Sequence, residues 1–167
     1  DGAEVPVGSY AVYVPELDSV AYGKPVTFRP FINAYQYMKY DAEKNEYSNR
    51  SIIFKSWKDE AIDAKGGVRC GKIPAKELAN LSEEERTKQK AIKCYRLIYG
   101  MVSFEGVLAG GNEAQVVNLP VLWKVTGSNF KPVGEAIESL RRRGKVMFNH
   151  TLTLKTKKKK AGSNVFY

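Results

Sequence analysis

The segment from Val26 to Tyr40 alternates aromatic and cationic side chains in a way that suits contact with a polyanion. In an extended strand, residues two apart share a face. One face then carries Arg29, Phe31, Asn33, Tyr35, Tyr37 and Lys39, and the other carries Phe28, Ile32, Ala34, Met38 and Tyr40. Flat rings stack on unpaired bases while Lys or Arg holds the phosphates, so the first face predicts a surface for single-stranded nucleic acid. The second face predicts core. The alternative is that Phe31 and Tyr35 fill the interior of a barrel.

Two further segments repeat this combination. Lys55 and Trp57 form a cation and ring pair on a second predicted strand, Tyr47 to Lys58, which also carries Arg50. On the strand from Lys93 to Phe104, Tyr95 could join the aromatic platform and Lys93 could contact a phosphate. The opposite face of that strand is typical of core, apart from Arg96. An interior position remains the alternative for Trp57.

Positive charge is concentrated at the end of the chain. Residues 141–167 contain nine Lys or Arg and no Asp or Glu, which equals the net charge of +9 for the whole protein. Such a local field attracts polyanions. Lys157, Lys158, Lys159 and Lys160 are predicted to form a hairpin turn that closes over a nucleic-acid strand, with a solvated turn as the alternative. The arginines at 141–143 also suit a helix C-terminus.

The sequence gives little support for catalysis, and we expect no enzyme activity, no cofactor and no metal site. His150 is the only histidine, and a lone histidine beside a strand is more often structural, so the sequence indicates no Ser/His/acid arrangement. With Cys70 and Cys94 this single histidine cannot complete a Cys/His zinc site. These two cysteines are expected to be reduced. Gly127-Ser-Asn129, at a predicted helix start, could hold one phosphate. No run of apolar residues is long enough to cross a membrane.

The order of predicted elements is strands, a polar insertion, further strands, one short helix and a final hairpin. The helix is predicted from Phe130, Val133, Ile137 and Leu140, which recur at helical spacing. Within the insertion, at about 59–91, Ser82 and Glu85 predict a capping box. This order predicts a mainly β fold: an OB-like, partly open Greek-key barrel of five to seven strands with one or two short helices. We expect one nucleic-acid-binding domain over 1–167.

Most of the chain, apart from the insertion, resembles bacteriophage single-stranded DNA-binding proteins. The similarity rests on Leu119-Pro-Val-Leu-Trp-Lys-Val-Thr-Gly-Ser-Asn-Phe130, on the helix that follows to Leu140, and on Phe148 to Tyr167 with its Lys-rich hairpin. The resemblance implies an OB-fold, sequence-independent binding of single-stranded DNA, and a role in phage DNA replication and recombination. In such proteins an acidic C-terminal tail often recruits replication enzymes. This sequence stops inside its last predicted strand, so we expect more chain to follow.

The resulting hypothesis is a non-catalytic protein that binds and protects single-stranded DNA in the cytoplasm of a host cell. The rings of Phe31, Tyr35, Tyr37, Trp57 and Tyr95 would stack with bases, while phosphates would contact Arg29, Lys39, Arg50, Lys55, Lys93 and Lys157 to Lys160. Replication or recombination proteins are further expected partners. One alternative is a structural or assembly protein that binds an acidic partner through its basic end. Another is an RNA-directed regulator, since no residue pattern identifies a reader of the 2′-hydroxyl.

Overall fold

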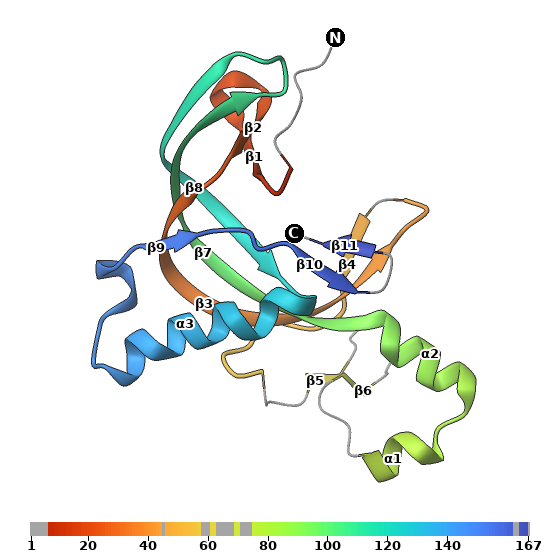
Figure 1. Ribbon diagram of the computed structural model, residues 1–167. Coiled ribbons are helices and arrows are strands. Elements are labelled where there is room, and N and C mark those ends of the chain that lie inside the picture. Colours follow the sequence, from red (N-terminus) through yellow and green to blue (C-terminus); the bar gives the residue numbers. More distant parts are fainter. Residues whose placement is uncertain are drawn as a thin grey trace. The chain divides into compact units, whose positions relative to one another are not determined.

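A computed structural model describes residues 7–44, 46–57, 61–62, 69–70, 75–161 and 164–166, and its architecture is mainly β (Figure 1). Its largest sheet has seven antiparallel strands. In sheet order these are β1 (Tyr10–Val14), β2 (Ser19–Gly23), β7 (Ile92–Leu108), β3 (Val26–Asp41) and β4 (Glu46–Asn49), with β8 (Glu113–Val125) paired to β7 and β9 (Leu152–Leu154) paired to β3. The predicted fold class, mainly β of the OB-like kind with short helices, is confirmed.

The remaining elements are short. Two small antiparallel pairs join β5 (Ala61–Ile62) to β6 (Arg69–Cys70) and β10 (Lys159–Ala161) to β11 (Asn164–Phe166). The α-helices are α1 (Ala75–Asn80), α2 (Glu83–Ala91) and α3 (Phe130–Arg142), and the 3-10 turns are η1 (Pro15–Leu17), η2 (Gly127–Asn129) and η3 (Met147–Asn149).

The chain divides into two compact units. The first comprises Asp1–Phe31, Tyr99–Val121 and Gly144–Tyr167, and the second comprises Ile32–Ile98 and Leu122–Arg143. Strands β3, β7 and β8 each contribute residues to both units. This division into units does not test the prediction of a single domain over 1–167, which stays a prediction.

In the first unit, the β1–β2 hairpin pairs Tyr10 with Gly23, and β9 pairs with the start of β3. Among the described residues of this unit, the buried apolar side chains include Val14, Ala21, Val26, Phe28, Pro30, Val102, Phe104, Val116 and Leu119. Gly100 is needed where β7 passes β3, because a Cβ at this position would collide with the backbone carbonyl of Arg29 and lie 2.6 Å from the Phe28 ring.

In the second unit, the middle of β3 is covered on both faces. All five side chains from Ala34 to Met38 are buried, and so are the four from Tyr95 to Ile98 on β7. Helix α3 buries Gly134 and Ile137, in agreement with the predicted helical spacing. A strand buried on both sides has no solvent face, so period-2 counting could not separate binding residues from core in this part of the chain.

Strand β4, which pairs with β3, is shorter than predicted, because the Ser51 side chain takes the place of a backbone partner in the ladder. Strand β4 ends at Asn49, and only an isolated bridge between Tyr35 and Phe54 resumes the pairing. Between them, the buried Ser51 hydroxyl accepts a hydrogen bond from the Tyr37 amide at 2.9 Å, and the Gln36 side chain donates to the Ser51 carbonyl at 2.9 Å. The prediction of a continuous strand from Tyr47 to Lys58 is therefore wrong.

The C-terminal hairpin also differs from its prediction. Lys159 and Lys160 lie in β10, where they pair with Phe166 and Val165, and not in a turn. Strand β2 was not predicted. In the insertion the capping box is confirmed: the Ser82 hydroxyl accepts from the Glu85 amide at 3.2 Å, and the Glu85 carboxylate accepts from the Ser82 amide at 2.9 Å. Helix α2 leads directly into β7 (Figure 1).

Candidate nucleic-acid interface

The residues predicted to bind DNA are distributed between the two units. Arg29, Phe31 and Lys157 to Lys160 belong to the first unit, and Tyr35, Tyr37, Lys39, Arg50, Lys55, Trp57, Lys93 and Tyr95 belong to the second. In the first unit, Arg29, Lys157 and Lys158 are exposed and Phe31 is half-buried. The side chains of Lys159 and Lys160 lie outside the described residues.

Three of the predicted stacking rings are buried. Tyr35, Tyr37 and Tyr95 are only 4%, 5% and 5% exposed. Tyr35 and Tyr37 both stack on Phe54, with ring centroids 6.1 and 5.5 Å apart, and Phe130 at the start of α3 lies 6.1 Å from Tyr35. The prediction that these rings face solvent is wrong. Phe54 and Phe130 cover the face of β3 that carries Tyr35 and Tyr37, whereas Tyr95 on β7 clusters with Met38 and Leu97 and contacts the Tyr47 ring. The interior alternative holds for Tyr35.

Arg96 forms the centre of a buried polar cluster in the second unit. Its guanidinium lies over the neighbouring rings of Tyr35 and Phe130, at 5.0 and 4.8 Å from their centroids. It donates hydrogen bonds to the Tyr35 hydroxyl at 2.8 Å and to the Asn33 side-chain oxygen at 3.1 Å, and the arginine is 4% exposed. The contacts combine cation–π attraction with hydrogen bonds, which offset part of the cost of burying the charge. Arg96 therefore ties β7 to β3 and α3.

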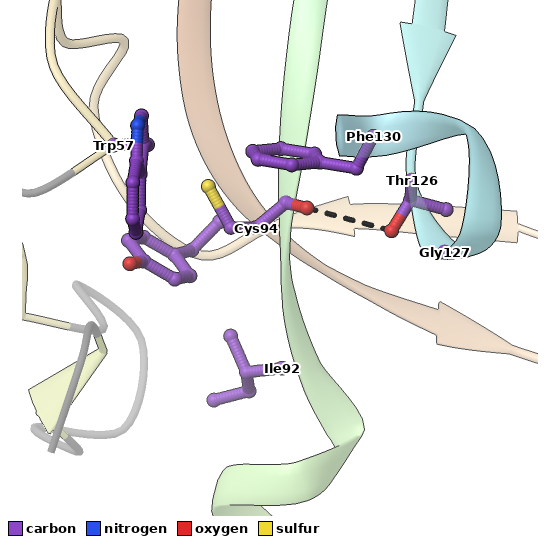
Figure 2. Close-up of a pocket in the computed structure, with 7 residues that line it drawn as sticks. Trp57, Ile92, Cys94, Thr126, Gly127 and Phe130 are labelled. Atoms are coloured by element: carbon purple, nitrogen blue, oxygen red, sulfur yellow. Dashed lines mark hydrogen bonds between the residues drawn. The ribbon is translucent and has the colours of Figure 1, made fainter. Parts of the chain in front are cut away.

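A pocket of about 420 Å³ lies beside this cluster in the second unit. Its lining residues are Tyr37, Trp57, Ile92, Cys94, Thr126, Gly127 and Phe130. In Figure 2 the Cys94 sulfur is seen between the rings of Trp57 and Phe130, and the Thr126 hydroxyl donates to the Cys94 carbonyl at 3.4 Å. Trp57 is 41% exposed, so part of this ring is open to solvent, as predicted for a stacking residue.

Cys94 is a free thiol in the wall of this pocket. Burial raises the pKa of the Cys94 thiol to about 11, although a hydrogen bond with Tyr37 and the charge of Arg96 act in the opposite direction. The thiol is therefore neutral at physiological pH, and it contributes to the pocket as a small apolar group.

A second exposed aromatic group lies on the β3–β4 hairpin. Tyr40 and Tyr47 pair across the strands, with ring centroids 4.9 Å apart, and they are 43% and 48% exposed. The Lys124 ammonium lies 5.3 Å from the Tyr47 ring, and Tyr95 supports that ring from below in an edge contact at 5.6 Å. We call Tyr40, Tyr47 and Lys124 the hairpin cluster. Burial and the neighbouring Tyr47 raise the pKa of Tyr95.

The hairpin cluster has no counterpart among the residues predicted from the sequence. Period-2 counting places Tyr40 on the core face, and neither Tyr47 nor Lys124 is among the predicted binding residues. The signal that could have found it is the hairpin register: the polar turn at 41–46 places Tyr40 opposite Tyr47, where rings of neighbouring strands meet. No sequence signal predicts the contact between Lys124 and Tyr47, since it depends on the position of β8 relative to β4 in the fold.

The predicted phosphate contacts in the second unit are mostly accessible. Lys39, Lys55 and Lys93 are exposed, and Arg50 is half-buried with its amide donating to the Tyr37 carbonyl at 2.8 Å. Lys55 precedes the pocket residue Trp57 by two positions, and Lys93 lies between the pocket residues Ile92 and Cys94. Cations thus accompany the exposed rings along the chain.

No family model, curated protein or solved structure matches the chain. Within the described residues, no three His, Cys, Asp or Glu side chains are grouped so that they could hold a metal ion. None of the helices in that same part of the chain has the length and apolar character needed to span a membrane.

Proposed function

We propose that this protein binds single-stranded DNA without sequence preference, as a non-catalytic protein of the phage DNA-binding type. The observation that carries the proposal is the pairing of exposed rings with cations in the second unit. Trp57 and the two tyrosines of the hairpin cluster are two groups of exposed rings, and Lys124, Lys39 and Lys55 supply positive charge. Stacking contributes about 1–3 kcal/mol per base and tolerates every base, because each has a flat face.

The proposal changes the residues that stack with bases. Trp57 keeps its role, while Tyr40 and Tyr47 replace Tyr35, Tyr37 and Tyr95, which are buried. The buried rings support the surface from beneath, as Tyr95 does for Tyr47. Phe31 is half-buried and belongs to the first unit together with Arg29 and the Lys-rich end. These cations add to the non-specific attraction for phosphates.

The proposed setting is phage DNA replication and recombination in the host cytoplasm, with the proteins of those processes as partners. The support for it is the resemblance of 119–130 and 148–167 to phage DNA-binding proteins, together with the net charge of +9. In this setting a sequence-tolerant surface protects any exposed strand.

A salt titration with a fluorescent oligo-dT tests the proposal. The logarithm of the binding constant should fall with the logarithm of the salt concentration by about 0.7 per phosphate contact. Trp57→Ala and Tyr47→Ala should each weaken binding by about fivefold or more. Tyr13→Ala is the matched control: it also removes an exposed tyrosine, but one whose hydroxyl bonds to Asp18, beside negative charge.

Two results would count against this function. A binding constant that does not respond to salt would exclude phosphate contacts, and equal losses in Tyr13→Ala and Trp57→Ala would exclude a defined aromatic surface. The acid-free segment 141–167 favours one competing function, a structural or assembly protein that binds an acidic partner. That function predicts no retention on single-stranded DNA and capture by an acidic polypeptide. Tighter binding of oligo-U than oligo-dT would indicate an RNA-directed protein.

A further inference from the structure

The pocket in the second unit has a composition that selects for one kind of chemical group. Its lining contains the rings of Tyr37, Trp57 and Phe130 and no charged side chain. Its volume of about 420 Å³ is within the range of sites that bind small molecules, about 300–1,000 Å³. Three rings around an uncharged space favour a flat, neutral group, because stacking contributes most where both surfaces are planar.

We propose that this pocket receives one nucleobase of the bound DNA strand, with Trp57 as its stacking platform. The inference rests on the proposed function and adds to it that one base leaves the strand and enters the second unit. The phosphates would remain outside, since no cation lines the pocket. Lys55 and Lys93 are exposed and lie within two positions of lining residues, so they are available to the DNA backbone there.

The polar groups of the pocket do not distinguish one base from another. The Thr126 hydroxyl donates to the Cys94 carbonyl, and the Cys94 thiol is hydrogen-bonded with Tyr37. Specific recognition of a base needs several donors and acceptors aimed at its edge. A pocket with so few of them accepts thymine and adenine with similar affinity, which agrees with binding that does not depend on sequence.

Two aromatic walls of the pocket, Phe130 and Tyr37, are held in place before any ligand arrives. Phe130 packs against the buried guanidinium of Arg96, and Tyr37 stacks on Phe54 at 5.5 Å. Gly127 leaves one side open, because a Cβ at this position would have no atom within 4 Å. A preformed site loses little conformational entropy on binding, so the stacking energy appears directly as affinity.

Tryptophan fluorescence tests the proposal, because Trp57 becomes the only indole in a Trp123→Phe protein. This protein is titrated with dT12, with an abasic 12-mer of equal charge, and with thymidine monophosphate. We expect dT12 to quench Trp57, the abasic strand to bind with little quenching, and the mononucleotide to bind far more weakly than dT12. Ile92→Phe, which places a fourth ring in the pocket, should weaken dT12 binding by at least about fivefold. Leu122→Phe is the matched control, because it adds a ring at an exposed position of β8.

The outcomes separate this inference from the function on which it rests. If dT12 binds with a normal salt dependence but Ile92→Phe behaves as Leu122→Phe does, the pocket proposal is wrong and the proposed function stands. Equal quenching of Trp57 by dT12 and the abasic strand would also show that the pocket proposal is wrong while the proposed function stands. Equal affinity for dT12 and thymidine monophosphate would show that the pocket is a site for free nucleotides. It would refute the proposal that the base comes from a bound DNA strand. Failure of dT12 to bind at any salt concentration overturns both.

Discussion

Gly134→Ala should destabilise this protein, although Gly to Ala inside a helix usually stabilises. Gly134 is the fifth residue of α3, and a Cβ there would collide with the Arg96 guanidinium, lying 2.9 Å from its central carbon. A flexible arginine could usually move aside. Here the guanidinium packs on the rings of Tyr35 and Phe130 and donates to the Tyr35 hydroxyl, and the arginine is 4% exposed. The clash must therefore displace α3, the arginine or a ring.

The magnitude follows from two opposing effects. Overpacking of a buried site costs about 1–3 kcal/mol. The higher helix propensity of alanine recovers about 1 kcal/mol. The net loss is then about 0–2 kcal/mol, and for a chain of this length each kcal/mol lowers the Tm by about 2–4 °C. Because Phe130 also lines the pocket, oligo-dT binding should weaken together with stability.

Urea unfolding of four proteins measures the effect: wild type, Gly134→Ala, Arg96→Met and the double variant. Arg96→Met alone should cost about 1–3 kcal/mol, since the Tyr35 hydroxyl and the Asn33 oxygen each lose a buried partner. In that background Gly134→Ala should cost nothing or stabilise, because the flexible thioether makes room. Gly110→Ala is the control, as a Cβ there would have no atom within 4 Å. Equal costs of Gly134→Ala in both backgrounds would refute the reasoning.

Three further predictions concern the salt dependence, the thiol and the insertion. Lys124→Gln should reduce the salt slope of oligo-dT binding by about 0.7 if this ammonium contacts one phosphate as well as the Tyr47 ring; an unchanged slope would limit it to the ring contact. Cys94 keeps its proton more tightly when folded, with a pKa of about 11 against 9.0. Its contribution to stability is thus complete below pH 9.0 and lost as the pH rises through 11, and Cys94→Ala should flatten that alkaline part of the urea-unfolding profile. Ser82→Ala removes the capping box of α2, so it should speed amide hydrogen exchange in that helix by about 2- to 30-fold, with exchange in β7 unchanged as the control.

The sequence predicted several elements because their signals are local. Alternating aromatics identified β3, helical spacing from Phe130 to Leu140 identified α3, and Ser82 with Glu85 identified the cap of α2. These patterns depend on residues a few positions apart, which contact one another whatever the rest of the chain does. Breaks in pairing were harder to foresee. The end of β4 depends on the Ser51 hydroxyl bonding to the amide of Tyr37, 14 residues earlier in the chain.

In the candidate site, too, some residues could be predicted from local sequence signals and others depend on the tertiary structure. The sequence identified Trp57 and its neighbour Lys55, and the structure places that ring at the edge of a pocket and leaves it partly exposed. It could not show that Tyr35 and Tyr37 are covered while Tyr40 and Tyr47 are open. Both pairs are aromatic, and both lie in or beside strands with period-2 alternation. Which face of a strand is covered depends on what packs against it, and that is a property of the whole fold.

The sequence alone determined the mainly β class, the concentration of cations in 141–167 and the supply of aromatic rings, because composition and short-range periodicity carry that information. Only the tertiary structure decided which rings meet solvent, because α3 and the residues around Phe54 close one face of β3. It also decided the place of Arg96, a cation that the sequence could only note as an exception in a core pattern. The guanidinium can be buried because two rings and two hydrogen-bond acceptors, from segments more than 30 residues away in the chain, converge on it.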